Sequence, residues 1–284
     1  VWMIRMCEEK LLCALENRYQ TAMEYYDKAI EAGCPKGYYG KGRLYHYGYS
    51  VEKDYAQAQE LYNKAIQGGA LEGYIGLGEL YEDGYAAGLS APDWEKALEY
   101  YKEAAKSDNY QCRCRAYTDI GLMYENGAGS LAADYAEARS WYDKAAEEGY
   151  PPAIYNVGNL FYRGKLCEQD YAEALSRFER AAKAGYSLSM NRIGYMYEHG
   201  NGVEQNSETA FNYYLMSANN GWLIGLRNLG NCYYAGNGVT QDYAQAYQCF
   251  SKAASENDAY SSGVLGEMYA YGNGVSQDDA QAFY

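Results

Sequence analysis

Proline and histidine are scarce in this 284-residue chain, which has 4 prolines and 2 histidines. So few prolines argue against a linker-rich chain, and the 37 tyrosines argue against a disordered one. Basic residues are also in short supply, because 24 Lys and Arg face 38 Asp and Glu, for a formal net charge of -14. Since binding to phosphate backbones requires clustered cations, nucleic acid and anionic membranes are not expected partners.

Long apolar runs are missing as well. No stretch approaches the length of about 18 apolar residues that a membrane helix needs, so no membrane insertion is expected. The chain begins at Val1 without a methionine and stops inside a repeat at Tyr284. We therefore expect a piece of a longer protein, and the presence of a signal peptide stays open.

The eight cysteines occur at irregular spacings and at different places in the repeat unit. A disulfide framework in a repeat protein should recur once per unit, so mostly reduced, packed thiols are expected. This favours a reducing compartment such as the cytoplasm, while a secreted or periplasmic location stays open. An isolated Cys232–Cys249 bridge between two helices of one unit is the alternative.

An internal repeat of about 36 residues organises the chain. Five residues before each aligned glycine stands a small residue, three residues after it an aromatic residue, and six residues after it another glycine. These positions share one face of a helix, and the last glycine suits a left-handed helix end. The aligned glycines are Gly42, Gly78, Gly121, Gly158, Gly194, Gly230 and Gly266.

A second helix is predicted in each unit after a glycine-rich turn. It opens on a residue type that caps helix N-termini and continues with an alanine, an aromatic residue and a further small residue on one face. The predicted caps are Asp54, Asp93, Asp134, Asp170, Asn206, Asp242 and Asp278. Each unit is thus an A helix, a turn and a B helix. Such a pair cannot bury enough apolar area alone, so the units are expected to stack into an all-α solenoid.

The predicted boundaries are a degenerate N-terminal capping helix pair over residues 1–36 and seven repeats over residues 37–284, the last one truncated. All are expected to form a single continuous solenoid domain. Residues 1–16 are predicted to form an apolar-rich helix, and residues 19–33 to form a B helix.

The pattern written by Ala116–Gly149, and more loosely by the other units, resembles the Sel-one-like repeat (SLR) family, a branch of the tetratricopeptide-repeat superfamily. The resemblance covers about residues 17–284. It implies an α/α right-handed superhelix of antiparallel helix pairs, used as an adaptor or scaffold for protein complexes, often in bacteria. It implies no chemistry. Ser207 and Asp279 depart from the pattern by replacing the usual aromatic residue after the B-helix cap.

Few residues suggest chemistry. His46 and His199 lie about four repeats apart, and both are interpreted as helix-end surface residues. Cys112 and Cys114 have no second pair to complete a zinc site. The repeated GNGV is interpreted as a structural turn, because it lacks the lysine and hydroxyl residue of a phosphate-binding loop. We therefore expect no enzyme, no cofactor, no metal and no small-molecule substrate.

Recognition is expected on the A helices, which line the concave surface in solenoids of this superfamily. Amides, guanidinium groups and a phenol gather there in the middle-to-late units, and they suit an extended peptide or an acidic protein segment. The alternatives are a solvated polar helix face without a ligand, and an accessory domain of a larger enzyme, signalling or secretion protein. The candidate binding residues are Asn156, Asn159, Arg163, Arg192, Tyr195, Arg227, Asn228 and Asn231.

Overall fold

The computed structural model describes residues 19–86, 88–127, 129, 132–166 and 168–282, so the helix predicted over residues 1–16 lies outside it. The chain forms two compact units, which we call the N-terminal unit, ending at Glu148, and the C-terminal unit, beginning at Gly149. The described residues contain helices and turns and no strand. The all-α solenoid prediction is confirmed.

The N-terminal unit alternates A helices with B helices. Residues 19–31 are helical, within the stretch predicted as the first B helix. The A helices are α2 (Lys36–Tyr47), α4 (Glu72–Glu82) and α6 (Tyr110–Asn126), and the B helices are α3 (Tyr55–Gln67), α5 (Trp94–Ala104) and α7 (Tyr135–Glu147). Each A helix packs against the B helix that follows it, and α2, α4 and α6 also contact one another in sequence.

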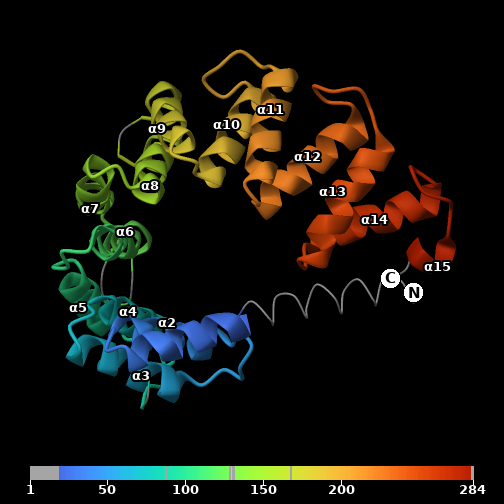
Figure 1. Cartoon of the computed structure of the whole chain (residues 1–284). Coiled ribbons are helices and arrows are strands. Elements are labelled where there is room, and N and C mark those ends of the chain that lie inside the picture. The colour runs from blue at the N-terminus through green and yellow to red at the C-terminus, as the bar shows by residue number, and fades with distance from the viewer. Residues whose placement is uncertain (1–18, 87, 128, 130–131, 167, 283–284) are drawn as a thin grey trace. The chain divides into compact units, whose positions relative to one another are not determined.

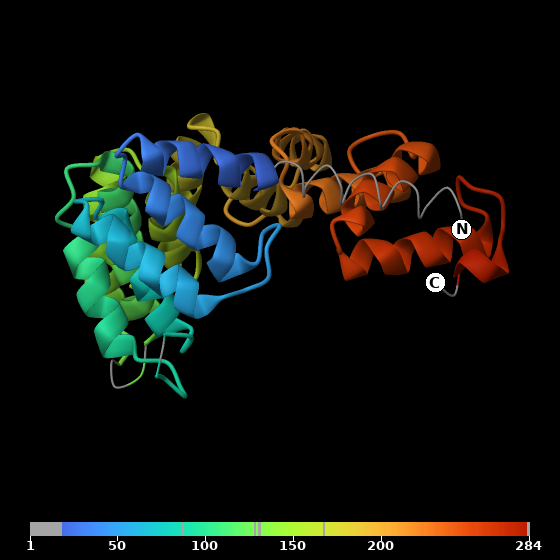
Figure 2. The same ribbon diagram turned by 60° about the horizontal axis from the view of Figure 1, so that its bottom comes forward.

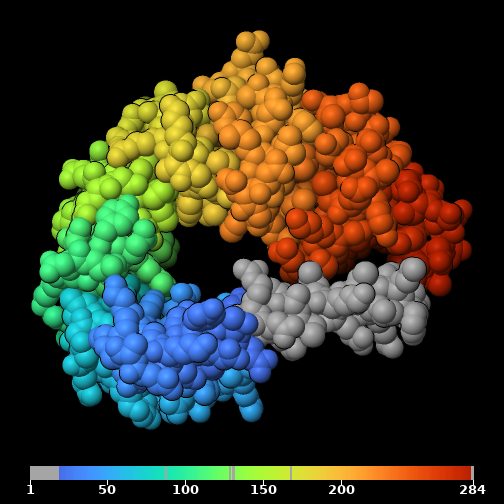
Figure 3. Space-filling model, viewed as in Figure 1, coloured from blue at the N-terminus to red at the C-terminus, as the bar shows by residue number. Residues whose placement is uncertain are grey.

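The C-terminal unit repeats this order (Figures 1 and 2). Its A helices are α8 (Pro151–Tyr162), α10 (Ser187–His199), α12 (Leu223–Ala235) and α14 (Ala259–Tyr271). Its B helices are α9 (Tyr171–Lys183), α11 (Ser207–Asn219), α13 (Tyr243–Ser255) and the short α15 (Asp279–Ala282). Successive hairpins of this unit form one packed surface in the space-filling view (Figure 3).

The predicted N-terminal caps of the B helices are confirmed. The side chain of Asp54 accepts a hydrogen bond from the backbone N–H of Gln57 at 2.8 Å, and the other six predicted caps make equivalent bonds. Each bond satisfies a helix N–H that has no partner within the helix. At the other end, Gly48 adopts φ 73° and ψ 38°, the left-handed conformation that a side chain would strain.

The aligned glycines admit the aromatic ring of the B helix. A Cβ added at Gly121 would lie 2.4 Å from the ring of Tyr142, and one added at Gly194 would lie 2.7 Å from the ring of Tyr214. Both tyrosines are almost fully buried. The glycine therefore lets the ring lie directly on the backbone of the A helix, and this contact fixes the hairpin.

The hydroxyl of this buried tyrosine meets the residue four positions after the aligned glycine. Tyr101, Tyr142 and Tyr214 donate to Glu82, Glu125 and Glu198 at 2.6, 2.8 and 2.6 Å. Where the B helix carries a phenylalanine, the A helix carries a tyrosine instead, and the two rings meet in a tilted or edge-on arrangement. The two pairs are Phe178 with Tyr162 and Phe250 with Tyr234, at centroid distances of 6.3 and 6.4 Å.

In the turns that carry a second glycine, that glycine lies where successive repeats meet. A Cβ on Gly202 would lie 2.2 Å from that of Tyr171, and one on Gly274 would lie 2.7 Å from that of Tyr243. Both glycines also have positive φ. The turn of one unit thus packs against the first residue of the preceding B helix, where a larger residue would push the units apart.

Three further expectations concern single residues. His199 is exposed as predicted, but the prediction for His46 is wrong, because its side chain is only 2% exposed and its Nδ1 lies 3.1 Å from the hydroxyl of Tyr62. Cys232 and Cys249 are free, buried thiols in one apolar cluster. No helix within the described ranges is long and apolar enough to cross a membrane.

Candidate functional site

All eight candidate binding residues lie in the C-terminal unit, on or at the end of three A helices. Helix α8 carries Asn156 and Asn159 and is followed by Arg163 as its C-cap. Helix α10 carries Arg192 and Tyr195, and helix α12 carries the remaining three. Helices α10 and α12 contact each other directly. We call this surface the amide–arginine face.

Arg192 joins α10 to α8. Its Nη2 donates to the hydroxyl of Tyr155 at 3.5 Å, and its guanidinium lies 5.2 Å from the ring centroid of Tyr162. Burial raises the pKa of Tyr162, although Asn201, which donates to its hydroxyl at 2.9 Å, and the charge of Arg192 act in the opposite direction. Arg192 makes no ion pair within the described residues, so most of its hydrogen-bonding capacity is available to a ligand.

Asn159 lies on the turn of α8 between these two tyrosines. The residue is 9% exposed, and its buried Oδ1 has no hydrogen-bond partner. A buried amide oxygen without a partner costs about 1–3 kcal/mol. An N–H group supplied from outside the protein would remove this cost.

The candidates on α12 are engaged within the protein. Arg227 Nη1 lies 3.3 Å from Asp258 Oδ1, and its guanidinium lies over the ring of Tyr260. Burial acts to raise the pKa of Asp258, but hydrogen bonds from Ser261 and the Arg227 charge outweigh it and hold that pKa below its usual range. The hydroxyl of Tyr260 donates to Asn231 Oδ1 at 3.1 Å. These contacts connect α12 to α14.

The remaining candidates also differ in whether their side chains are engaged within the protein. Asn228 Nδ2 donates to Asn191 Oδ1 at 2.8 Å and so connects α12 to α10. Tyr195 is 37% exposed and stacks on His199 with centroids 4.0 Å apart. Asn156 is half-buried and makes no hydrogen bond to any described residue. Arg163 is exposed at the end of α8.

The sequence analysis missed the phenols that hold the two arginines, namely Tyr155, Tyr162 and Tyr260. Tyr155 and Tyr162 stand three residues before and four residues after an aligned glycine, so they share a helix face. That spacing is a signal that could have found them.

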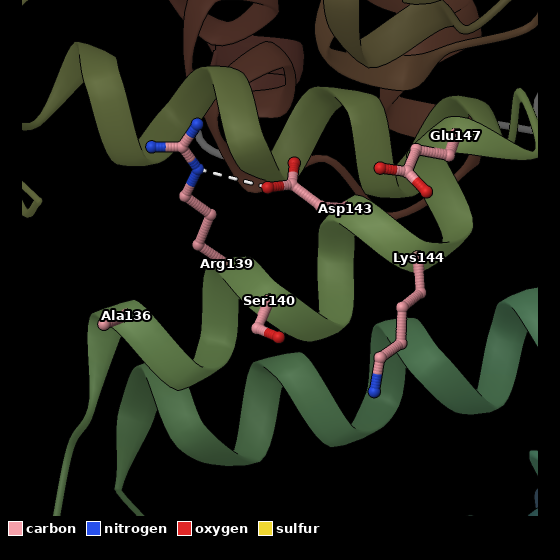
Figure 4. Close-up of a pocket in the computed structure, with 6 residues that line it drawn as sticks. All are labelled: Ala136, Arg139, Ser140, Asp143, Lys144 and Glu147. Carbon is pink, nitrogen blue, oxygen red and sulfur yellow. Dashed lines mark hydrogen bonds and ion pairs between the residues drawn. The ribbon is translucent and has the colours of Figure 1, made fainter.

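A shallow depression lies on α7 in the N-terminal unit (Figure 4). Its lining side chains come from this one helix and point away from it, and Arg139 pairs with Asp143 at 3.2 Å. No second element contributes a converging group, so the depression is a helix surface. Across the part of the chain that the structure describes, no three His, Cys, Asp or Glu side chains are placed to hold a metal ion.

Comparison with known proteins identifies the family. The Sel1 repeat model matches eight segments, at residues 6–34, 35–69, 71–109, 114–150, 151–186, 187–222, 224–258 and 264–284. The predicted division into residues 1–36 and 37–284, and the single continuous domain, stay predictions. No curated protein sequence is significantly similar to the chain.

Solved structures share the fold. The crystal structure of c5321, a protective antigen of uropathogenic Escherichia coli strains with an SLR fold, is 31% identical, has a TM-score of 0.62, and covers 92% of this chain. The chain spans 54% of that protein, about half its length. A Sel1 repeat protein from Oxalobacter formigenes is 27% identical, with a TM-score of 0.58, over 92% of this chain and 96% of the other.

The immunity protein Pa5087 from Pseudomonas aeruginosa is 22% identical, with a TM-score of 0.58. The match covers 79% of this chain and 83% of that protein, and it shows the fold alone. Sel1 repeat proteins generally mediate protein–protein interactions and are typically non-catalytic repeat scaffolds. With eight repeat matches along nearly the whole sequence, the chain belongs to the Sel1 repeat family.

Proposed function

We propose that the chain is a non-enzymatic scaffold that binds an extended peptide or protein segment along the amide–arginine face of the C-terminal unit. The A helices would form the concave side of this unit. Contact between α10 and α12 supports this orientation, because in a curved two-layer stack the helices of the inner layer lie closer together.

The observation that carries the proposal is the buried, unpartnered amide oxygen of Asn159, which lies on α8 between the two tyrosines that the guanidinium of Arg192 contacts. The backbone N–H of a bound segment would donate to Asn159, and a carboxylate of the same segment would accept from Arg192 in two-point geometry. Asn156 and the exposed ring of Tyr195 extend this surface. Arg227 and Asn228 would act by positioning the helices, whereas the amide of Asn231 already accepts from Tyr260 and would add little to binding.

The test separates binding from folding. Peptides selected against the purified protein from a displayed random library would be measured by fluorescence anisotropy with variants of the face. Arg192→Ala and Asn159→Leu should each weaken binding about tenfold or more, the usual effect of losing a charged or buried hydrogen bond. Asn159→Leu should leave stability unchanged or raised, because it removes a polar atom that has no partner in the free protein.

Asn231→Leu is the matched control, since Asn231 occupies the same repeat position on α12 but already accepts from Tyr260. It should leave peptide affinity within about threefold of the wild type, well below the loss expected of a buried contact. Equal binding by the wild type, Arg192→Ala and Asn159→Leu would remove the proposal.

A further inference from the structure

The arginines of this acidic chain are mostly neutralised by nearby carboxylates. Arg113 pairs with Glu148, and Arg115 pairs with Glu79. In the C-terminal unit, the equivalent pairings are Arg177 with Glu173 and Arg227 with Asp258. Arg192 lacks such a partner among the described residues, and so does Arg43 in the N-terminal unit.

Arg43 is held in place by aromatic residues of its own helix. It lies on α2 with Tyr39 one turn before it and Tyr47 one turn after it. Its guanidinium is 5.5 Å from the ring centroid of Tyr47. Its Nε is buried and has no hydrogen-bond partner. A guanidinium stays charged in proteins, so this buried N–H cannot avoid its cost by losing a proton.

Of the two carboxylates in this network, Glu79 is occupied by other donors, and Asp119 pairs with Arg115 rather than with Arg43. Glu79 accepts from the hydroxyl of Tyr47 at 2.9 Å and from Arg115. Asp119 Oδ2 forms an ion pair with Arg115 Nε at 3.6 Å but accepts no hydrogen bond. Arg115 also donates to the hydroxyl of Tyr39 at 3.2 Å. These bonds connect α2, α4 and α6 and leave the charge of Arg43 without a counterion.

We propose that Arg43 is a second ligand-anchoring site, which binds the side-chain carboxylate of an aspartate or glutamate in a partner segment. Two donors on one edge of the guanidinium, Nε–H and an Nη–H, match the two oxygens of a carboxylate. The ring of Tyr47 keeps the guanidinium oriented before binding, which lowers the entropy that the ligand contact must offset. The site lies in the N-terminal unit, and no residue of the amide–arginine face contributes to it.

Side-chain NMR tests the site directly. In ¹⁵N-labelled protein, the Nε–Hε signal of Arg43 would be followed during titration with an acetylated, amidated triglutamate peptide. We expect a saturable downfield shift of this signal, because its hydrogen gains an acceptor. The Arg113 signal should not move, since Arg113 Nε already donates to Glu148 at 2.9 Å. The matching triglutamine peptide should give no response.

Arg43→Lys keeps the charge but loses the planar pair of donors, and triglutamate binding, followed in both proteins through the ring protons of Tyr47, should be about tenfold weaker. Absence of a saturable shift at Arg43, or equal shifts with triglutamine or inorganic phosphate, would overturn the proposal. The Arg192 signal reports separately on the amide–arginine face, so failure at one arginine leaves the proposal for the other standing.

Discussion

The hydrogen-bonded pair of Tyr214 and Glu198 can be used to test whether the side-chain pair of one repeat can replace that of another. We expect that it can. Tyr214 is 1% exposed, and its hydroxyl donates to Glu198 Oε2 at 2.6 Å. The equivalent pair in the preceding hairpin is Phe178 with Tyr162, whose hydroxyl accepts from Asn201 of the next turn. Asn237 stands at the corresponding turn position after Glu198. The double variant Tyr214→Phe, Glu198→Tyr should therefore reproduce a pairing that the fold already uses.

The single substitutions should cost more than the pair. Tyr214→Phe removes a bond to a carboxylate that is 38% exposed and can regain water, so a loss of about 1 kcal/mol is expected. Glu198→Tyr takes the acceptor away from a buried hydroxyl, at a cost of about 1–3 kcal/mol. In the double variant no buried hydroxyl lacks a partner, and we expect a total cost below about 1 kcal/mol.

Urea unfolding followed by far-UV circular dichroism gives the three free-energy changes. Because long repeat arrays can depart from two-state unfolding, amide hydrogen exchange in α11 would give the change in the free energy of local opening for each variant. The coupling energy should be at least about 1 kcal/mol and favourable. A double variant that loses as much stability as the two single variants together would refute the reasoning.

Two further predictions concern the pH dependence of stability and the repeat glycines. Burial raises the pKa of Asp119 from 3.8 to about 8, helped by Glu79 and Glu82 and opposed by Arg115, so the folded state holds this proton more tightly than the unfolded state. The free energy of unfolding should fall as pH rises through this range, by at most about 1.4 kcal/mol per pH unit. Asp119→Asn should flatten the plot of urea midpoint against pH, and an unchanged plot would contradict this assignment. Gly238→Ala should destabilise more than Gly221→Ala, because both have positive φ but only the former Cβ would meet the backbone oxygen of Ser207. Gly263→Ala, in open space inside α14, should stabilise by about 0.5–1 kcal/mol, and thermal melts of the three variants in any other order would contradict the packing argument.

The features that the sequence predicted correctly depend on residues close together in the chain. Asp54 caps α3 through an N–H three residues away, and Gly48 ends α2 through its own φ. Such local rules act the same way in every unit, so their recurrence makes them visible in one sequence. The stacking of hairpins followed because a single pair cannot bury enough apolar area.

The error at His46 has a physical cause that the sequence contained. His46 stands four residues after an aligned glycine, a position that faces the buried ring of the following B helix. It therefore contacts Tyr62 as Glu82 contacts Tyr101. The prediction for His46 considered its polarity and its place near the helix end, but not this repeat position. The two positions also change together within the chain. Elsewhere, a tyrosine on the B helix occurs with a glutamate on the A helix, and a phenylalanine occurs with a tyrosine, which indicates that the two positions are in contact.

The state of each candidate side chain depends on its neighbours across the helix stack, which sequence position does not give. Asn159 and Asn231 occupy the same repeat position, yet only Asn231 has a partner, because Tyr260 stands within reach on α14. Arg192 and Arg227 differ likewise, since Asp258 neutralises only the latter. These partners lie about a repeat away in the chain, and their approach is set by packing between units.

The position that Asn159 occupies is one where the fold accepts several kinds of side chain. The other units place Arg43, Glu79, Leu122, Tyr195, Asn231 and Glu267 there. Since charged, apolar and aromatic residues all fit, the hairpin itself does not require an amide at this point. An apolar residue there would avoid the cost of about 1–3 kcal/mol that a buried oxygen without a partner carries. A cost that folding does not demand is characteristic of sites that meet a ligand, which is why the amide of Asn159 supports binding on this face.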